Sequence, residues 1–429
     1  MHENLDLDPS TKNWLVVFLD EVRECIAADT AKVSSYLKTR GKLLNFSHFY
    51  IHESGLFYGY VDSHKLGTYT NSETWNGVDR FKIAVVEGLV LTYLHSQKRR
   101  ISQGESYGAL VQECAEKLYE FYVLFTMNDV QSQRYRTIFQ KNSDKFVALE
   151  QAIDARVSNP SMLERGFWKG SQFNIFTALD VVYFAYWLQG IYEYDRRNII
   201  KNEIIALMDE ASHLVQESNK NALSTVAYFI ASGNFGVNSN EVVRNDIDFG
   251  ECLRREAPLT HRLQFEYAAY VSLVDDQKER TKTDFLHTVA KRLGLSEQEE
   301  QESLLMVDSF LANNAEHIFY LHYGEGVNLI KNAFNMRFQS FVTKNKAKIV
   351  EEVMDSKELV ELLRKSVSEE LSDDEKQKVK MQIFDLMKTV PSLAIFMIPG
   401  GTIILPVLFK ILPEEILMPS SFINKKTEK

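Results

Sequence analysis

Proline is nearly absent from the first 390 residues of this 429-residue chain. Pro9, Pro160 and Pro258 are the only prolines there, and the other five of the eight lie in the last 39 residues. A proline inside a helix costs about 3 kcal/mol or more, because it removes a hydrogen bond and clashes with the preceding turn. This scarcity predicts long helices, and an all-α fold for the body of the protein.

Cysteine is also scarce, and the N-terminus lacks a secretory signal. Cys25, Cys114 and Cys252 are far apart, and no C-x-x-C pair occurs, so neither a disulfide framework nor a zinc knuckle is indicated. The first residues are acidic and lack a basic stretch followed by an apolar one. We therefore expect reduced thiols and a body that stays in the cytoplasm.

The chain is acidic overall, although lysines gather locally, and it has no nucleotide-binding or hydrolase motif. The formal net charge is -10, which argues against direct nucleic-acid binding. The G-x-x-x-x-G-K-[ST], G-x-G-x-x-G and G-x-S-x-G patterns do not occur. We therefore expect a non-enzymatic protein without catalytic residues, cofactor or metal.

Helical signals fill most of the remaining chain. Asp8-Pro9 predicts a helix start, and Trp14, Val17, Phe18 and Val22 follow as an apolar stripe. Helical periodicity also covers 78–97, 106–128 and 131–157. Between these segments, glycines alternate with aromatic residues over 46–77, which predicts loops and a short hairpin.

The most apolar internal run is 173–191. Asp180 lies in its middle, and the uncharged part after it falls short of the ~20 residues that a bilayer requires. We expect a buried core helix rather than a membrane span.

Two histidines, His48 and His52, have the i, i+4 spacing of a helical metal site. A zincin requires a glutamate between its histidines, whereas Glu53 follows the second one here. We therefore expect both histidines to be structural.

A second helical region follows residue 195. Within it, 275–300 resembles the tellurite-resistance-B-like helical domain, with Gly294 ending one helix and a Ser296–Glu299 capping box starting the next. That resemblance implies Asp275 and Asp276 as metal ligands. A solvated acidic helix start is the simpler interpretation.

Residues 314–366 are typical of a long amphipathic helix, and Ser372 with Glu375 forms a second capping box. The expected divisions are an N-terminal helical domain at 1–195, a second at 196–335, amphipathic helices at 336–390, a hydrophobic segment at 391–412 and a tail at 413–429.

The terminal segment differs from everything before it. Residues 389–409 are 21 residues without a charge, which as a helix would span about 31 Å, close to the hydrocarbon thickness of a bilayer. It is punctuated by Pro391, Pro399, Gly400, Gly401, Thr402, Pro406 and Pro413. A single crossing, a re-entrant hairpin broken at Pro399-Gly400-Gly401, and a segment buried in the body all stay open.

Lysines precede this segment, and we expect them to contact lipid headgroups or a partner. They are Lys344, Lys346, Lys348, Lys376, Lys378, Lys380 and Lys388. Their excess before the segment places the N-terminal body on the cytoplasmic side of the inner (cytoplasmic) membrane.

Residues 371–422 resemble the LETM family, the leucine-zipper and EF-hand transmembrane proteins. The residues that carry the resemblance are Asp385-Leu386, Val390-Pro391, Pro399, Leu405-Pro406-Val407, Lys410, Pro413 and Met418-Pro419-Ser420-Ser421-Phe422. The resemblance implies an inner-membrane segment and roles in potassium–proton or calcium–proton exchange or in ribosome binding. The layout, a large helical body followed by the family motif, resembles that of the bacterial LETM-related group labelled biofilm-associated.

Two departures from the family pattern limit what the resemblance implies. Thr402 stands where family members carry a glutamate, so the segment lacks the ionisable group that exchange requires. The family's ribosome-binding domain follows its membrane segment, whereas only seven residues follow Phe422 here.

We expect a non-enzymatic, membrane-anchored scaffold or membrane-homeostasis protein. The alternatives are a component of cation–proton exchange and a ribosome-binding adaptor. The partners would be membrane lipid, a ribosome or another membrane protein, or further copies of the chain.

Overall fold

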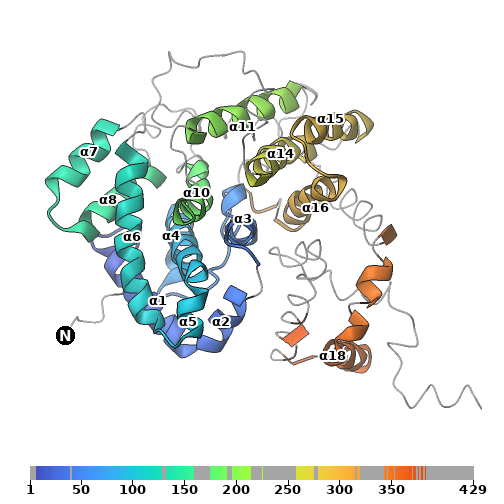
Figure 1. Cartoon of the computed structure of the whole chain (residues 1–429), viewed down its shortest axis with the longest axis horizontal. Coiled ribbons are helices and arrows are strands. Elements are labelled where there is room, and N and C mark those ends of the chain that lie inside the picture. Colours follow the sequence, from blue (N-terminus) through green and yellow to red (C-terminus); the bar gives the residue numbers. More distant parts are fainter. Residues whose placement is uncertain are drawn as a thin grey trace, which may run out of the picture.

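The computed structural model is helical throughout, and no strand occurs among the residues that it describes (Figure 1). These run from 6 to 382, with gaps at 39–40, 128–131, 159–173, 191–195, 214–224, 226–257, 275–278, 315, 319–342, 345, 352, 370, 373–374, 376–377 and 380–381. The predicted all-α class is confirmed for this part of the chain. The segment 391–412 and the tail 413–429 lie outside it.

The first group of helices surrounds one buried helix. The group consists of α1 (Trp14–Ala28), α2 (Thr30–Lys38), α3 (Leu43–Glu53), η1 (Leu56–Tyr58), η2 (Ser72–Thr74), α4 (Gly77–Ser96), α5 (Lys98–Ser102), α6 (Tyr107–Met127), α7 (Ser132–Lys141), α8 (Lys145–Val157), η3 (Ile175–Ala178) and α10 (Leu179–Leu188). Helix α4 packs against α2, α3, α6, α8 and α10. Its residues from Phe81 to His95 are all buried, as expected for a helix that is apolar on every side.

The close approach of α3 to α4 depends on one glycine. A Cβ atom at Gly88 of α4 would lie 2.3 Å from a ring carbon of Tyr50 of α3. The Tyr50 hydroxyl donates a hydrogen bond to Glu87, at 2.9 Å, and also contacts the Ala84 carbonyl. The absence of a side chain at Gly88 therefore allows α3 to pack this close to α4.

Within the apolar run 173–191, residues 175–188 form η3 and α10, as buried core helix rather than membrane span. Asp180 is completely buried, and its carboxylate accepts two hydrogen bonds from Arg156, at 2.7 and 2.8 Å. The Tyr122 hydroxyl donates a further bond at 3.3 Å. The charge in the middle of the run is therefore neutralised inside the protein.

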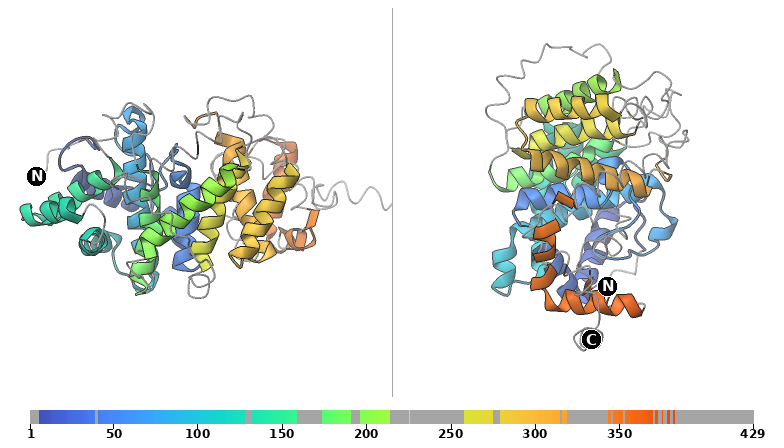
Figure 2. Two further views of the ribbon diagram at one scale, coloured as in Figure 1. Left: turned by 90° about the horizontal axis from the view of Figure 1, so that it is seen from above. Right: turned by 90° about the vertical axis from the view of Figure 1, so that its right-hand side faces the viewer.

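The second group packs against α3 and touches α10 through the contact between the Tyr186 and Thr260 hydroxyls. It consists of α11 (Arg196–His213), α14 (Pro258–Leu273), α15 (Glu279–Arg292) and α16 (Glu297–Asn314). Figure 2 shows α14 beside α11, α15 and α16, and α14 also touches α3. One core of buried apolar residues extends from Leu7 to Ile318 across both groups. The division at 195/196 stays a prediction.

A smaller unit follows the main core. It comprises helical residues between 343 and 355, α18 (Lys357–Ser368) and described positions up to 382. Ile349, Val353, Leu359 and Leu363 are buried here, and they do not belong to the main core. Figure 1 shows α18 beside the main body rather than within it.

Several sequence predictions of local structure are wrong. Helix α1 begins at Trp14 and not at Pro9, because the Asp8 carboxylate binds the backbone and side chain of Ser10 and forms a turn. Residues 46–53 are helical, as part of α3, and no strand occurs in 46–77. Burial on every side of α3 obscured its period, because polar and apolar residues from Phe46 to Glu53 are all buried.

Two predicted long helices are interrupted. The Asp144 side chain caps α8 and so separates it from α7 within 131–157. Within 314–366, helix α16 ends at Asn314, and Ser356 caps α18 by accepting a hydrogen bond from the Leu359 amide at 3.3 Å. Side-chain caps compete with helix continuation at both interruptions.

Among the described residues, no helix is both long and apolar enough to cross a membrane. The segment 391–412, for which a crossing, a re-entrant hairpin and burial in the body were the alternatives, is not among them.

Candidate functional site

The predicted membrane residues cannot be compared with the structure. Pro391, Pro399, Gly400, Gly401, Thr402, Pro406 and Pro413 lie outside the described residues, as do Lys376, Lys380 and Lys388. The same holds for Asp275 and Asp276. Lys344, Lys346, Lys348 and Lys378 are described, and all four are exposed.

The capping box that precedes the terminal segment is present. The Glu375 carboxylate accepts hydrogen bonds from the Ser372 amide and hydroxyl, both at 3.0 Å. The Ser372 hydroxyl oxygen accepts a bond from the Glu375 amide at 3.3 Å. A helix therefore begins at the predicted residue.

This helix start is held against α18 by three polar contacts. Lys365 lies 2.6 Å from Glu375, the Ser356 hydroxyl donates to Gln382 at 2.7 Å, and Gln382 donates to Glu358 at 2.6 Å. Leu371 and Val379 are buried. The described positions from Ser372 to Gln382 therefore pack along α18.

The exposed lysines do not all share one face. Lys344 and Lys348 are four residues apart on helical backbone and lie on the same side. Lys346 is two residues from each and lies on a different side. Lys344 contacts Glu297 at 3.8 Å, but both side chains are more than half exposed, so this pair contributes little.

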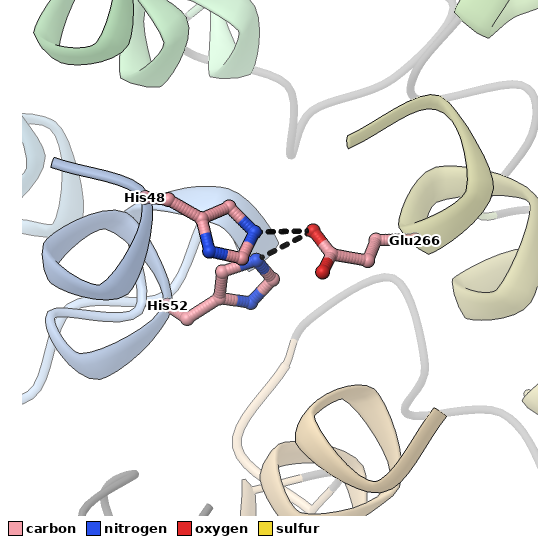
Figure 3. Close-up of side chains that lie close together, drawn as sticks. All are labelled: His48, His52 and Glu266. Carbon is pink, nitrogen blue, oxygen red and sulfur yellow. Dashed lines mark hydrogen bonds and ion pairs between the residues drawn. The ribbon is translucent and has the colours of Figure 1, made fainter. Parts of the chain in front are cut away.

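A second candidate site lies inside the body, where α3 meets α14. His48 and His52 are one helical turn apart on α3, and Glu266 comes from α14 (Figure 3). Both Nε2 atoms contact the same oxygen of Glu266, Oε2, at 2.8 Å for His48 and 3.0 Å for His52. All three side chains are buried, and their ligating atoms lie within 4.8 Å of one another.

The other carboxylate oxygen of Glu266 has its own partners. The Arg262 guanidinium lies 3.1 Å from Oε1, and the Ser303 hydroxyl donates to it at 2.8 Å. Arg262 also pairs with Glu302 at 3.4 Å. Glu266 is therefore held from two sides, by α14 itself and by α16.

Tyr58 contacts Nδ1 of His52, the ring nitrogen that does not face Glu266. Its hydroxyl lies 2.8 Å from Nδ1 of His52 and 3.3 Å from the Met306 carbonyl oxygen. Gly55 makes this turn possible, because its φ of 81° is in the left-handed region and a Cβ there would overlap the Tyr60 carbonyl. The loop after α3 thus places η1 beside the histidines.

Burial and charge set the protonation of the site in opposite ways. Burial lowers the pKa of His52 to about 4. Burial alone would raise the pKa of Glu266, but the neighbouring histidines hold it well below its usual range. An ionised carboxylate and a neutral His52 follow at neutral pH.

Sequence reasoning found the two histidines but not their partner. Glu266 is 214 residues from His52, and no local pattern connects them. The neighbouring Glu53 lies elsewhere and accepts a hydrogen bond from Tyr36 at 2.8 Å. The i, i+4 spacing of the two histidines was the one usable signal in the sequence. The prediction of loops over 46–77 set it aside, because this spacing brings side chains together only on a helix.

Comparison with known proteins bears on the C-terminus alone. A protein-family model described as "LETM1-like, RBD" matches residues 371–429. Nothing among the curated proteins or the solved structures matches. The match begins one residue before the Ser372 cap. The description of the family model, RBD, therefore applies to residues 371–429 themselves and not to a separate domain after the hydrophobic segment. The LETM resemblance of the C-terminal segment is therefore established, and it is confined to residues 371–429.

Proposed function

We propose that this protein is a non-enzymatic adaptor that holds ribosomes at the inner (cytoplasmic) membrane. Residues 371–429 would supply the anchor and part of the docking surface, lysines that precede them would supply the rest, and the helical body would lie in the cytoplasm. The observation that carries the proposal is the match of these residues to a family model whose description, RBD, denotes a ribosome-binding domain.

The composition of the segment supports membrane association. Residues 389–409 carry no charge, and about 31 Å of helix suffices for one crossing. The helix that starts at Ser372 would lead from α18 into the membrane. Its attachment through Lys365–Glu375 and Ser356–Gln382 would orient the body relative to the bilayer.

The exposed lysines are the best candidates for contact with ribosomal RNA. Lys344 and Lys348 present two positive charges on one helix face, and Lys378 adds another charge near the membrane lead-in. Phosphate contacts dominate affinity for nucleic acid and weaken steeply with salt. A local basic face would serve this purpose although the whole chain carries -10.

Charge reversal tests the proposal. Full-length protein in detergent or vesicles is mixed with ribosomes and sedimented at several salt concentrations. We expect the double variant Lys344→Glu/Lys348→Glu to bind at least tenfold more weakly. The double variant Lys12→Glu/Lys32→Glu makes the same change in net charge at exposed positions of the N-terminal region and should bind normally. Equal binding by all three proteins would contradict the proposed lysine contact, and no binding by the wild type would contradict ribosome docking.

Cation–proton exchange has less support. Exchange requires a protonatable group within the membrane, and residues 389–409 contain no acidic, basic or histidine side chain. Proton-linked potassium or calcium flux in vesicles containing the purified chain would reverse this preference.

A further inference from the structure

We propose that His48, His52 and Glu266 bind a divalent first-row transition-metal ion, such as Zn²⁺, that cross-links α3 to α14. This inference is independent of the C-terminal segment and of ribosome docking. It rests on the geometry of the three side chains and on the groups that orient them.

The ligating atoms are already gathered at one point. Figure 3 shows both imidazole rings projecting from α3 toward the carboxylate of Glu266. The two Nε2–Oε2 distances are 2.8 and 3.0 Å. Ligands about 2.1 Å from a zinc-like ion lie roughly 3.0 to 3.4 Å from each other, depending on the coordination angle. Each of these two distances therefore needs to increase by only a few tenths of an ångström to admit the ion, and all three ligating atoms already lie within 4.8 Å of one another.

The residues that hydrogen-bond to the proposed ligands have the arrangement that a metal site requires. A histidine that binds metal through Nε2 donates its Nδ1 proton to a neighbouring acceptor. The Tyr58 hydroxyl oxygen can accept a hydrogen bond from the Nδ1–H of His52, and the Tyr58 hydroxyl can donate its own hydrogen bond to the Met306 carbonyl. This assignment satisfies both contacts of the hydroxyl at once and leaves the Nε2 lone pair of His52 facing Glu266.

The same assignment makes a place for a cation between His52 and Glu266. With its proton on Nδ1, His52 places a lone pair 3.0 Å from a carboxylate oxygen, so two acceptors face each other. A cation between them converts that repulsion into coordination. If the proton were on Nε2 instead, Tyr58 would donate to His52 and the Met306 contact would have no hydrogen.

Glu266 is prepared to bind through one oxygen. Arg262 and Ser303 occupy Oε1, and Oε2 is left to the two histidines. Arg262 is positively charged and would repel a cation, but its charge is offset by Glu302, with which it also pairs. Glu266, Glu302 and Arg262 together thus carry one net negative charge beside the cation.

The ligand types indicate the class of metal and its role. Imidazole nitrogen with one carboxylate suits zinc, iron, cobalt and nickel, whereas calcium and magnesium prefer oxygen ligands alone. His52 and Glu266 are fully buried, and His48 retains 5% exposure of its side chain. The ion would therefore reach the site past His48 and would act as a structural link between α3 and the second helix group.

Metal binding by the purified full-length chain in detergent tests the proposal. After chelator treatment and dialysis, Zn²⁺ is titrated by calorimetry, and Co²⁺ binding is followed by its visible absorption. We expect one ion per chain. Zn²⁺ at a hundredfold excess over its dissociation constant should raise the midpoint of thermal unfolding by about 2–4 °C.

Variants locate the ion. Loss of any one ligand should weaken Zn²⁺ binding by more than a hundredfold, as tested by His48→Asn, His52→Asn and Glu266→Gln. Loss of a residue that only hydrogen-bonds to a ligand costs about 10–100-fold. Tyr58→Phe keeps the packing of its ring and removes only the hydroxyl that hydrogen-bonds to His52, so it should weaken binding about tenfold. His287→Asn removes a histidine whose side chain is 68% exposed and should bind as the wild type does.

Circular dichroism establishes whether each variant is folded before its affinity is compared. If a ligand variant does not fold, Tyr58→Phe and His287→Asn still separate the proposed site from adventitious binding. A wild type that binds no Zn²⁺ or Co²⁺, or folded ligand variants that bind as it does, would overturn the proposal.

Discussion

The Nζ atom of Lys365 lies 2.6 Å from Oε1 of Glu375 and joins α18 to the first turn of the LETM-like segment. The same glutamate closes the capping box with Ser372. Lys365, followed by the backbone bond from Ser372, lowers the pKa of Glu375 to about 2. One carboxylate thus both starts the lead-in helix and attaches it to the body.

Removal of the cap should loosen this helix locally. Ser372→Ala eliminates the oxygen that accepts from the Glu375 amide, and the loss of such a cap costs about 1 kcal/mol of helix stability. We expect backbone amides from 375 to 382 to exchange hydrogen about fivefold faster, as measured by mass spectrometry.

The equivalent change at the other capping box provides the control. Ser296→Ala removes the hydroxyl that accepts from the Glu299 amide in α16. It should speed exchange at the start of α16 and leave 375–382 unchanged. A global change in exchange for either variant would show that the cap does not act locally.

The buried ion pair between Arg156 and Asp180 should dominate the stability of its region. Asp180→Asn leaves a guanidinium buried without its charge partner, which costs about 3–5 kcal/mol. Urea denaturation followed by circular dichroism measures the loss. Glu120→Gln breaks the exposed pair with Lys117 and should change the free energy of unfolding by less than about 1 kcal/mol. Equal effects of the two changes would contradict the assignment.

Gly88 should tolerate no side chain. Gly88→Ala places a methyl group against the Tyr50 ring and should destabilise the protein by about 1–3 kcal/mol. Gly108→Ala offers a matched control in α6, because a Cβ there meets nothing within 4 Å. The control should be neutral or stabilising by up to about 1 kcal/mol, because alanine restricts the unfolded chain. Thermal or urea unfolding distinguishes the two outcomes.

His95 should make stability fall with acidity. It is buried and stacks on Phe46, with ring centroids 4.4 Å apart. Burial, followed by the charge of Lys98, lowers its pKa from 6.5 to about 3. Below pH 6.5 the unfolded chain therefore binds the proton and the folded chain does not, so the histidine's contribution is complete above pH 6.5 and is lost as pH falls toward 3.

Comparison of His95→Gln with the wild type isolates this effect. The loss is at most about 1.4 kcal/mol per pH unit in that range. Urea unfolding at pH 7.5, 6.0 and 5.0 should show a shallower decline for the variant than for the wild type. Parallel declines would show that His95 is protonated in the folded protein.

The sequence predicted features that depend on nearby residues. Both capping boxes, the Gly294 helix end with its φ of 70° and the buried run around Asp180 were all accessible from spacing and composition. Each of these depends on groups within a few residues, where backbone geometry decides the outcome.

The sequence failed where partners come from distant segments. The burial of α3 on all sides concealed its helical period, and Glu266 reaches His48 across 218 residues. The helix break at Ser356 was missed because buried apolar residues occur on both sides of it, Ile349 and Val353 before it and Leu359 and Leu363 after it. For the terminal segment, the family resemblance came from motif order, which requires no tertiary information.

Ribosome retention on membrane vesicles tests the central claim most directly. Vesicles containing the full chain, the Lys344→Glu/Lys348→Glu variant or the Lys12→Glu/Lys32→Glu control are washed with carbonate and incubated with ribosomes at low and moderate salt. A chain that ends at residue 370 serves as the anchor control and should leave the membrane in the wash. We predict that the full chain and the control variant stay in the membrane and retain ribosomes, whereas the Lys344→Glu/Lys348→Glu variant stays in the membrane and loses them. A full chain that leaves the membrane in the wash, or that remains there without retaining ribosomes, would contradict the account.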